Sequence, residues 1–187
     1  MTTQASANHT AKVIGVTIAA AVGGFLFGFD SSVINGAVDS IQGRFALGEF
    51  LTGFTVAIAL LGCAAGAWFA GGLADRWGRK KVMLLGSALF IISSVGSGLA
   101  FSVPDLMLWR VLGGLGIGIA SVIAPAYIAE ISPARMRGSL ASLQQLAITI
   151  GIFAALLSDA VLADRADGAA NELWLGLEAW RWMFLVG

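Results

Sequence analysis

The chain has 187 residues, of which 58% are apolar and 12% charged, with a mean hydropathy of +0.87 and 11 basic residues balanced by 11 acidic ones. This composition excludes an ordinary soluble domain, in which about a quarter of the residues are charged, and the zero net charge produces no field that would attract nucleic acid. The lone cysteine, Cys63, and the lone histidine, His9, exclude an intrachain disulfide framework and a Cys/His metal cluster, which leaves a protein that folds in lipid.

Five stretches of the chain are long and apolar enough to span a bilayer, which takes about 20 residues, and a sixth begins near the end. The five cover residues 13–37, 50–74, 82–101, 104–129 and 138–163, and the sixth covers 180–187. Residues 1–12 precede them as a polar tail. Because the connections between the spans are short, the sequence predicts a single all-α membrane bundle. A signal peptide is the weaker reading of the first stretch, whose apolar run is longer than usual.

The lysine and arginine residues predict the orientation, because cytoplasmic loops are enriched in both. With the N-terminus in the cytoplasm, the cytoplasmic segments contain Lys12, Arg76, Arg79, Lys80, Lys81, Arg135 and Arg137, and the outer segments contain Arg44, Arg165 and Arg181. The reverse orientation would invert this bias. We therefore expect a multi-pass protein of the cytoplasmic membrane with a cytoplasmic N-terminus, and we expect Trp180 and Trp182 at the outer interface.

Asp30 and Arg110 are the informative charged residues inside the predicted spans. Each would cost about 2.5–3.5 kcal/mol in hydrocarbon on the insertion scale. The first span runs outward and the fourth runs inward, so at ~1.5 Å per residue both charges lie roughly 10 Å below the outer interface. They can pair if the two helices are neighbours. The sequence leaves two roles open, a proton-coupling site beside a polar cavity and a fixed ion pair that orients two helices.

Three polar amides also fall within the spans. Gln144 and Gln145 lie in the fifth span, and because adjacent residues differ by about 100° around a helix, at most one can point squarely into the bundle centre. An amide both donates and accepts hydrogen bonds, which suits a hydroxylated ligand. The alternative is a helix–helix hydrogen bond worth about 0.6 kcal/mol. Asn35, near the outer end of the first span, has the same two readings.

Glycine is abundant in the fourth span, where Gly113, Gly114, Gly116 and Gly118 occur in close succession. A phosphate-binding loop would need a strand before it and a helix opening after it. Small residues allow helices to approach closely in lipid, so these glycines predict tight helix packing.

Two cytoplasmic turns contain clustered charges. Residues 71–81 read GGLADRWGRKK, in which Gly78 can adopt a positive φ and Asp75 is placed to meet a helix N-terminus. In the next cytoplasmic turn, Glu130 closes the fourth span and Arg137 opens the fifth. Arginine binds carboxylates bidentately, so a switchable charge network is plausible on this side of the membrane. A turn that only sets topology is the alternative.

Four segments together resemble the sugar porter branch of the major facilitator superfamily. Residues 71–81 are similar to that family's turn between its second and third helices, and RVLGGLGIG at 110–118 to its fourth-helix motif. EISPARMRG at 130–138 resembles its turn between helices four and five. FLFGFDSSVINGA at 25–37 resembles the first helix of its proton-coupled members. The order and spacing of the four segments also agree with the family.

The resemblance implies a role for each matching residue. It implies that Asp30 is the proton-coupling carboxylate, that Arg110 is its partner, and that Gln145 contacts sugar. The implied cytoplasmic gating network comprises Gly72, Asp75, Arg76, Gly78, Arg79, Glu130 and Arg137. Ile152 occupies a position where some relatives have a second glutamine, so the choice of sugar stays open.

The family has twelve helices in two halves that hold the substrate between them. We therefore expect residues 13–187 to be the N-terminal half-bundle of a major facilitator fold, with the C-terminal half-bundle absent. The expected function is proton-coupled transport of a monosaccharide such as glucose by alternating access, without a cofactor or metal and with lipid as surroundings. A truncated, non-transporting product and a sugar facilitator or sensor without proton coupling stay open, whereas no nucleophile–base set supports a membrane enzyme.

Overall fold

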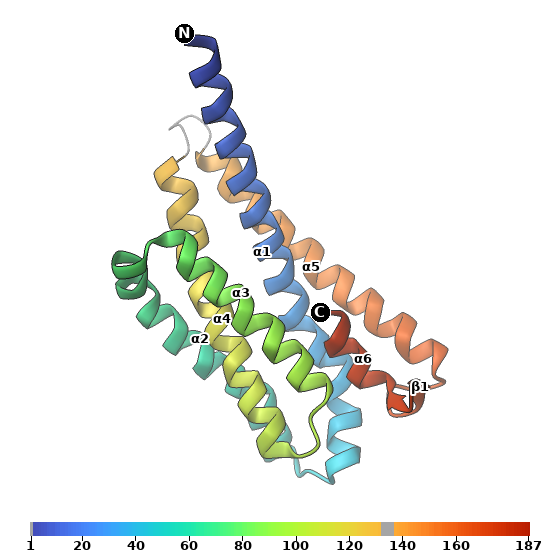
Figure 1. Cartoon of the computed structure of the whole chain (residues 1–187). Coiled ribbons are helices and arrows are strands. Elements are labelled where there is room, and N and C mark those ends of the chain that lie inside the picture. Colours follow the sequence, from blue (N-terminus) through green and yellow to red (C-terminus); the bar gives the residue numbers. More distant parts are fainter. Residues whose placement is uncertain (1, 132–136) are drawn as a thin grey trace.

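The computed structural model describes residues 2–131 and 137–187; of residues 2–20, 131 and 137 it describes only the helical backbone, except at Gly15 and Ile18. The elements in chain order are α1 (Thr2–Phe45), α2 (Glu49–Trp77), α3 (Arg79–Gly98), α4 (Val103–Ile131), α5 (Arg137–Arg165), β1 (Glu172–Trp174), β2 (Leu177–Glu178) and α6 (Ala179–Val186). Figure 1 shows the long helices as one bundle, with the first part of α1 extending beyond the others.

Within the described residues, five helices are long and apolar enough to cross a membrane, which confirms the five predicted spans. Their ends differ from the prediction. The first helix runs to Phe45, although the polar sequence from Asp39 onward predicted a connection there. The helix continues because Ile41 is buried in the core and Phe45 packs against it. It ends where Ala46 adopts a φ of 50° and the Leu47 amide donates to the Gln42 carbonyl over 3.0 Å.

The turn between α2 and α3 is a single residue, Gly78, where the sequence predicted a link over residues 75–81. Gly78 has a φ of 86°, as predicted, and its amide donates to the Ala74 carbonyl over 2.9 Å. A side chain here would be strained by the left-handed φ. The chain reverses within this one residue, so the flanking basic residues belong to the first turn of α3.

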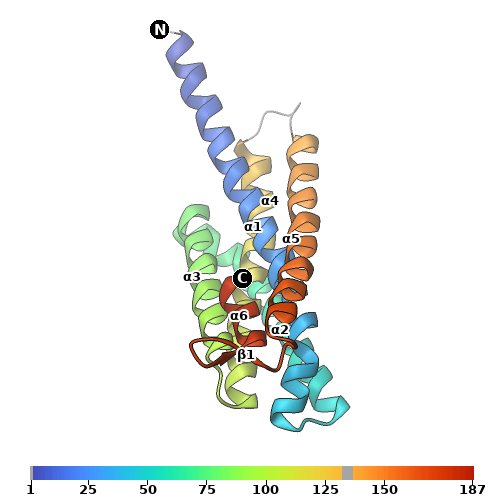
Figure 2. The same cartoon turned by 90° about the vertical axis from the view of Figure 1, so that its right-hand side faces the viewer.

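The helices pack in two main sets, with α4 against α2 and α3, and α1 against α5 (Figures 1 and 2). Glycines stand at the closest approaches. A side chain at Gly118 would collide with the Cys63 carbonyl of α2, and one at Gly151 with the Phe25 carbonyl of α1. In lipid, close backbone approach supplies the van der Waals contact that holds helices together. The predicted packing role of the fourth-span glycines is confirmed.

The connection between α5 and α6 contains a β-hairpin that the sequence did not predict, in which β1 pairs antiparallel with β2. The short α6 that follows packs against α1, α3 and α5. Trp180 is fully buried in the core, so the predicted interfacial position is wrong for this tryptophan. Its indole has a partner, because Nε1 donates to Glu178 over 3.0 Å. Arg181 holds α6 to the end of α3 by donating to the carbonyls of Gly98 and Ala100.

Candidate functional site

The structure brings the two charges within the spans together. Arg110 on α4 places Nη1 3.3 Å from Oδ1 of Asp30 on α1, and 3.5 Å from Oδ2. Both residues are buried, with 8% of Asp30 and 4% of Arg110 exposed. The two residues are 80 positions apart in the sequence, and the contact between α1 and α4 brings them together. An ion pair within the helix bundle is therefore the central polar feature of the chain.

The Arg110 guanidinium is only partly satisfied by this pair. Its Nε is buried without a hydrogen-bond partner among the described residues. Its Cζ lies 5.7 Å from the centre of the Phe184 ring of α6, within the range of a cation–π contact. Asp30 is thus the sole carboxylate that the guanidinium contacts in the described chain. Neutralising Asp30 would remove the main electrostatic interaction of Arg110.

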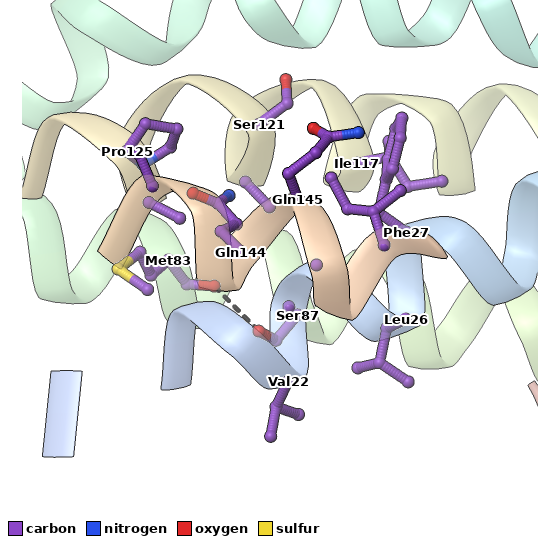
Figure 3. A pocket seen from close by; sticks show the side chains of 16 residues that line it. Val22, Leu26, Phe27, Met83, Ser87, Ile117, Ser121, Pro125, Gln144 and Gln145 are labelled. Carbon is purple, nitrogen blue, oxygen red and sulfur yellow. Dashed lines mark hydrogen bonds between the residues drawn. The ribbon is translucent and has the colours of Figure 1, made fainter. Parts of the chain in front are cut away.

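A cavity of about 420 Å³ lies between α1, α3, α4 and α5 (Figure 3). Asp30 and Arg110 are not among its lining residues, but Phe27 at its wall precedes Asp30 by three residues, so the two Cα atoms are roughly 4.5 Å apart along the axis of α1. Both Gln144 and Gln145 of α5 line the cavity, together with apolar residues of the other helices. This volume falls in the range of small-molecule sites, about 300–1,000 Å³.

The two glutamine amides are the polar side chains of this cavity whose N–H donors remain for a ligand. Ser87 donates to the Met83 carbonyl over 3.1 Å, and Ser121 to the Gly118 carbonyl over 2.9 Å. Both hydroxyl protons are therefore used within their own helices, and the two hydroxyl oxygens remain only as acceptors. In Figure 3 the amides of Gln144 and Gln145 diverge, with that of Gln145 on the side of Ser121. Mostly apolar walls with few polar groups are typical of small-molecule sites.

Asn35 does not join this cavity. It is exposed and lines a different hollow of about 280 Å³ between α1, α5 and α6. Eight residues separate it from Phe27 on α1, which corresponds to roughly 12 Å along the helix. The structure thus places the three predicted sugar-contacting amides at two separate positions.

The structure brings together one pair of the predicted cytoplasmic network. Arg79 Nη2 at the start of α3 lies 2.8 Å from Glu130 Oε1 near the end of α4. This contact joins the two predicted cytoplasmic turns. Gly72, Asp75, Arg76 and Gly78 are exposed, and within residues 2–131 and 137–187 neither Asp75 nor Arg76 has a hydrogen-bond or ion-pair partner through its side chain. The side chain of Arg137 lies outside the described residues.

One ionisable residue inside the spans escaped the sequence reasoning. Asp159 lies in the last third of the fifth predicted span, four residues before its end at residue 163, and 4% of it is exposed. Both carboxylate oxygens are buried without a hydrogen-bond partner in the described chain. The signal that could have found it is the one that found Asp30, namely an acid in an apolar run.

Comparison with known proteins identifies a family model and several relatives that this chain matches. Residues 16–187 match the family model described as "Sugar (and other) transporter". The glucose transport protein of Synechocystis sp. is 59% identical over 173 residues, which is 92% of this chain and 37% of the relative. The D-xylose-proton symporter of Escherichia coli K12 is 34% identical, over 94% of this chain and 40% of its own.

The fold has solved counterparts. The structure of the major facilitator superfamily proton:xylose symporter XylE bound to 6-bromo-6-deoxy-D-glucose superposes with a TM-score of 0.84 at 34% identity. The match covers 95% of this chain and 42% of that one. This chain therefore spans about two fifths of the length of the proteins it matches, and it has the fold of an N-terminal half-bundle.

Proposed function

Because the chain belongs to the sugar porter family of the major facilitator superfamily, we propose that the whole protein carries a monosaccharide across the cytoplasmic membrane together with a proton. The observation that carries the proposal is the buried ion pair of Asp30 and Arg110 in a half-bundle that also contains a cavity lined by Gln144 and Gln145. A hexose such as glucose is the proposed substrate, since the Synechocystis relative is named as a glucose transport protein. The family is one of transporters, not of enzymes.

Asp30 is proposed as the proton-binding group. It is buried, and its carboxyl group pairs with the Arg110 guanidinium. A proton that binds Asp30 would weaken the pair and free Arg110, whose remaining described contact is the Phe184 ring. The contact between α1 and α4 would then loosen. Proton binding would in this way bias the equilibrium between conformations open to opposite sides.

Gln145, with Gln144 beside it, is proposed to hold the sugar. Amides can donate to and accept from neighbouring hydroxyls of one pyranose ring. The other side of the sugar would be contacted by a second half-bundle, as in transporters whose site lies between two related halves. Residues 13–187 are proposed as the first of these halves, with residues 1–12 as a cytoplasmic segment.

Arg79 and Glu130 are proposed as part of a cytoplasmic gate. Their 2.8 Å contact joins the start of α3 to the end of α4. We propose that Arg137 adds to this network, and that Gly72, Asp75, Arg76 and Gly78 shape the turn beside it. The cytoplasmic placement is supported by the concentration of lysine and arginine on this side.

The function is tested by transport in proteoliposomes that contain the whole protein. We expect labelled glucose to enter, and addition of glucose without an imposed gradient to make the external medium alkaline as protons follow the sugar. Competition with unlabelled xylose, arabinose and galactose ranks the substrates. Entry of sugar without alkalinisation would reject proton coupling, and absence of uptake for every sugar in the panel would reject the proposal as a whole.

Replacing Gln145 with alanine is expected to raise the half-saturation concentration for sugar about five-fold, because the loss of one hydrogen bond costs about 1 kcal/mol. Initial rates of labelled uptake over a range of sugar concentrations measure the effect. Gln42→Ala is the matched control, since Gln42 lies near the end of α1 and donates to the Leu47 carbonyl. An equal rise in both variants would contradict a direct contact between Gln145 and sugar.

A further inference from the structure

Asp159 on α5 is a second acid buried within the helix bundle, and it lies apart from the pair of Asp30 and Arg110. Its side chain lies against Gly36 of α1, where any side chain on residue 36 would overlap the carboxyl group. Gly36 follows Asp30 by six residues, so Asp159 meets α1 roughly 9 Å further toward the Phe45 end. The glycine thus makes room for a carboxyl group at the contact of α1 with α5.

The carboxyl group has no polar partner in this position. Neither Oδ1 nor Oδ2 accepts a hydrogen bond from a described residue, and 4% of Asp159 is exposed. The Gly36 backbone amide lies close to the carboxyl group but makes no hydrogen bond of normal geometry with it. Asp30, by comparison, has a guanidinium 3.3 Å away. The two buried acids therefore have opposite surroundings.

Asp159 lines the 280 Å³ hollow between α1, α5 and α6. The other lining residues are uncharged, and they are Asn35, Gly36, Leu156, Ala160, Ala163 and Met183. The hollow thus offers a route for water or a small ion to the carboxyl group, with one amide side chain at its wall. It contains no residue of the cavity that the two glutamines line.

Among the residues that the structure describes, no charged group pairs with Asp159. The charged residues of α1 from Asp30 onward and of the segment from Asp159 through α6 are Asp30, Asp39, Arg44, Asp164, Arg165, Asp167, Glu172, Glu178 and Arg181. Arg181 and Arg44 are both paired with Glu178, at 3.0 and 3.3 Å. Among the described residues, no cation forms an ion pair with Asp159. The other acids in the list would oppose a negative charge.

We propose that Asp159 is a second proton-binding site of this protein, occupied in the described conformation and reached through the hollow that Asn35 lines. An ionised carboxylate without a cation or a donor is so costly in an apolar interior that the group takes up a proton instead. A proton from water forms an O–H bond with one carboxylate oxygen and returns to water on release. Ionisable groups inside a membrane bundle are functional candidates by default.

Release is coupled to the contact between α1 and α5. Separation of the two helices would admit water to the carboxyl group and stabilise the anion, and their return would require the proton again. The use of this step during sugar transport rests on the proposed function, whereas proton binding by Asp159 does not. Asp159 lies toward the Phe45 end of α1, which is the proposed outer side, so it would load before Asp30 during inward transport.

Infrared spectroscopy of the whole purified protein in lipid at neutral pH tests the proposal. We expect a carbonyl stretching band of a protonated carboxyl group, and we expect Asp159→Asn to abolish it. Asp164→Asn is the matched control, because Asp164 is an exposed acid on the same helix, and it should leave the band unchanged. An unchanged band in Asp159→Asn would overturn the proposal.

Two further measurements cover a variant that does not fold and the binding of a metal cation in place of a proton. If Asp159→Asn does not fold, the infrared spectrum is recorded on the unsubstituted protein with carbon-13 in its aspartate carboxyl groups. The absence of any protonated aspartate band at neutral pH would then reject the site. Loss of the band on addition of sodium or potassium ions at constant pH would assign the hollow to a metal cation and overturn proton binding. The variant Asp30→Asn separates the two proposals. Sugar accumulation that is retained in this variant rejects the proposed function of Asp30, whereas the infrared band of Asp159 is expected to stay intact.

Discussion

Replacing Asp30 with asparagine is expected to abolish accumulation of sugar against its gradient while exchange of labelled for unlabelled sugar continues. One elementary charge that crosses a membrane potential of 100 mV releases about 2.3 kcal/mol. That free energy supports a roughly 50-fold concentration ratio of sugar. An asparagine has nearly the shape of the neutral acid and cannot bind or release a proton, so the variant should cycle but only equilibrate the sugar.

The measurement uses proteoliposomes with an imposed potential, in which the internal sugar concentration is followed to its plateau. Asp39→Asn provides the control, because Asp39 is an exposed acid on the same helix and its neutralisation should preserve accumulation. A high plateau in Asp30→Asn would show that another group couples the proton. Loss of both exchange and accumulation would indicate that the pair has a structural role, which is the alternative that the sequence left open.

Replacing Arg110 with leucine is expected to destabilise the folded bundle by about 3–5 kcal/mol, because it leaves the buried Asp30 carboxylate unpaired. The double variant Asp30→Asn with Arg110→Leu should recover most of this loss, since no uncompensated charge then remains. Thermal unfolding in detergent, followed by the accessibility of Cys63 to a thiol reagent, measures the difference. The cysteine lies at the contact of α2 with α4, near Gly118, and becomes accessible when the helices separate.

Arg44→Leu is the control for this cycle. The Arg44 side chain is 57% exposed and pairs with Glu178 at the surface, where an ion pair is worth about 0–1 kcal/mol. If the double variant is no more stable than Arg110→Leu alone, the stabilisation arises from the contact of Arg110 with Phe184 and not from its pairing with Asp30. The cycle therefore separates the two contacts of the guanidinium.

The two buried acids illustrate how surroundings can assign different roles to one residue type. Asp30 lies 3.3 Å from a guanidinium, and Asp159 lies against a glycine without any partner in the described chain. In the first arrangement a proton would compete with a cation for the carboxyl group. In the second no described cation competes for it. A transporter with both would bind protons at two sites, one on α1 and one where α5 contacts α1.

Local sequence was sufficient for the membrane class and for the helices themselves. Apolar content summed over about 20 residues measures the free energy of transfer into lipid, which is a property of each segment alone. It therefore predicted the five spans that the structure contains. The positive φ of Gly78 was also predictable, because reversal of the chain between two helices requires a residue without a side chain.

The helix ends were less predictable for a physical reason. Residues 39–45 are polar in part, and their sequence indicates a connection. They stay helical because Ile41 and Phe45 extend the buried face of α1 onto the core around α6. The sequence also placed Trp180 at an interface, since indoles favour the headgroup region. Contact with the surrounding helices buries it instead.

The sequence by itself determined that this is a bundle of membrane-spanning helices with a charge in the first and the fourth, and it indicated the family through four motifs. Only the tertiary structure decided which charges meet. It joined Asp30 to Arg110, placed Gln144 and Gln145 in one cavity and Asn35 in another, and left Asp159 without a hydrogen-bond partner among the described residues. Hydropathy is a sum along one segment, whereas these contacts depend on the rotation and depth of helices from distant parts of the chain.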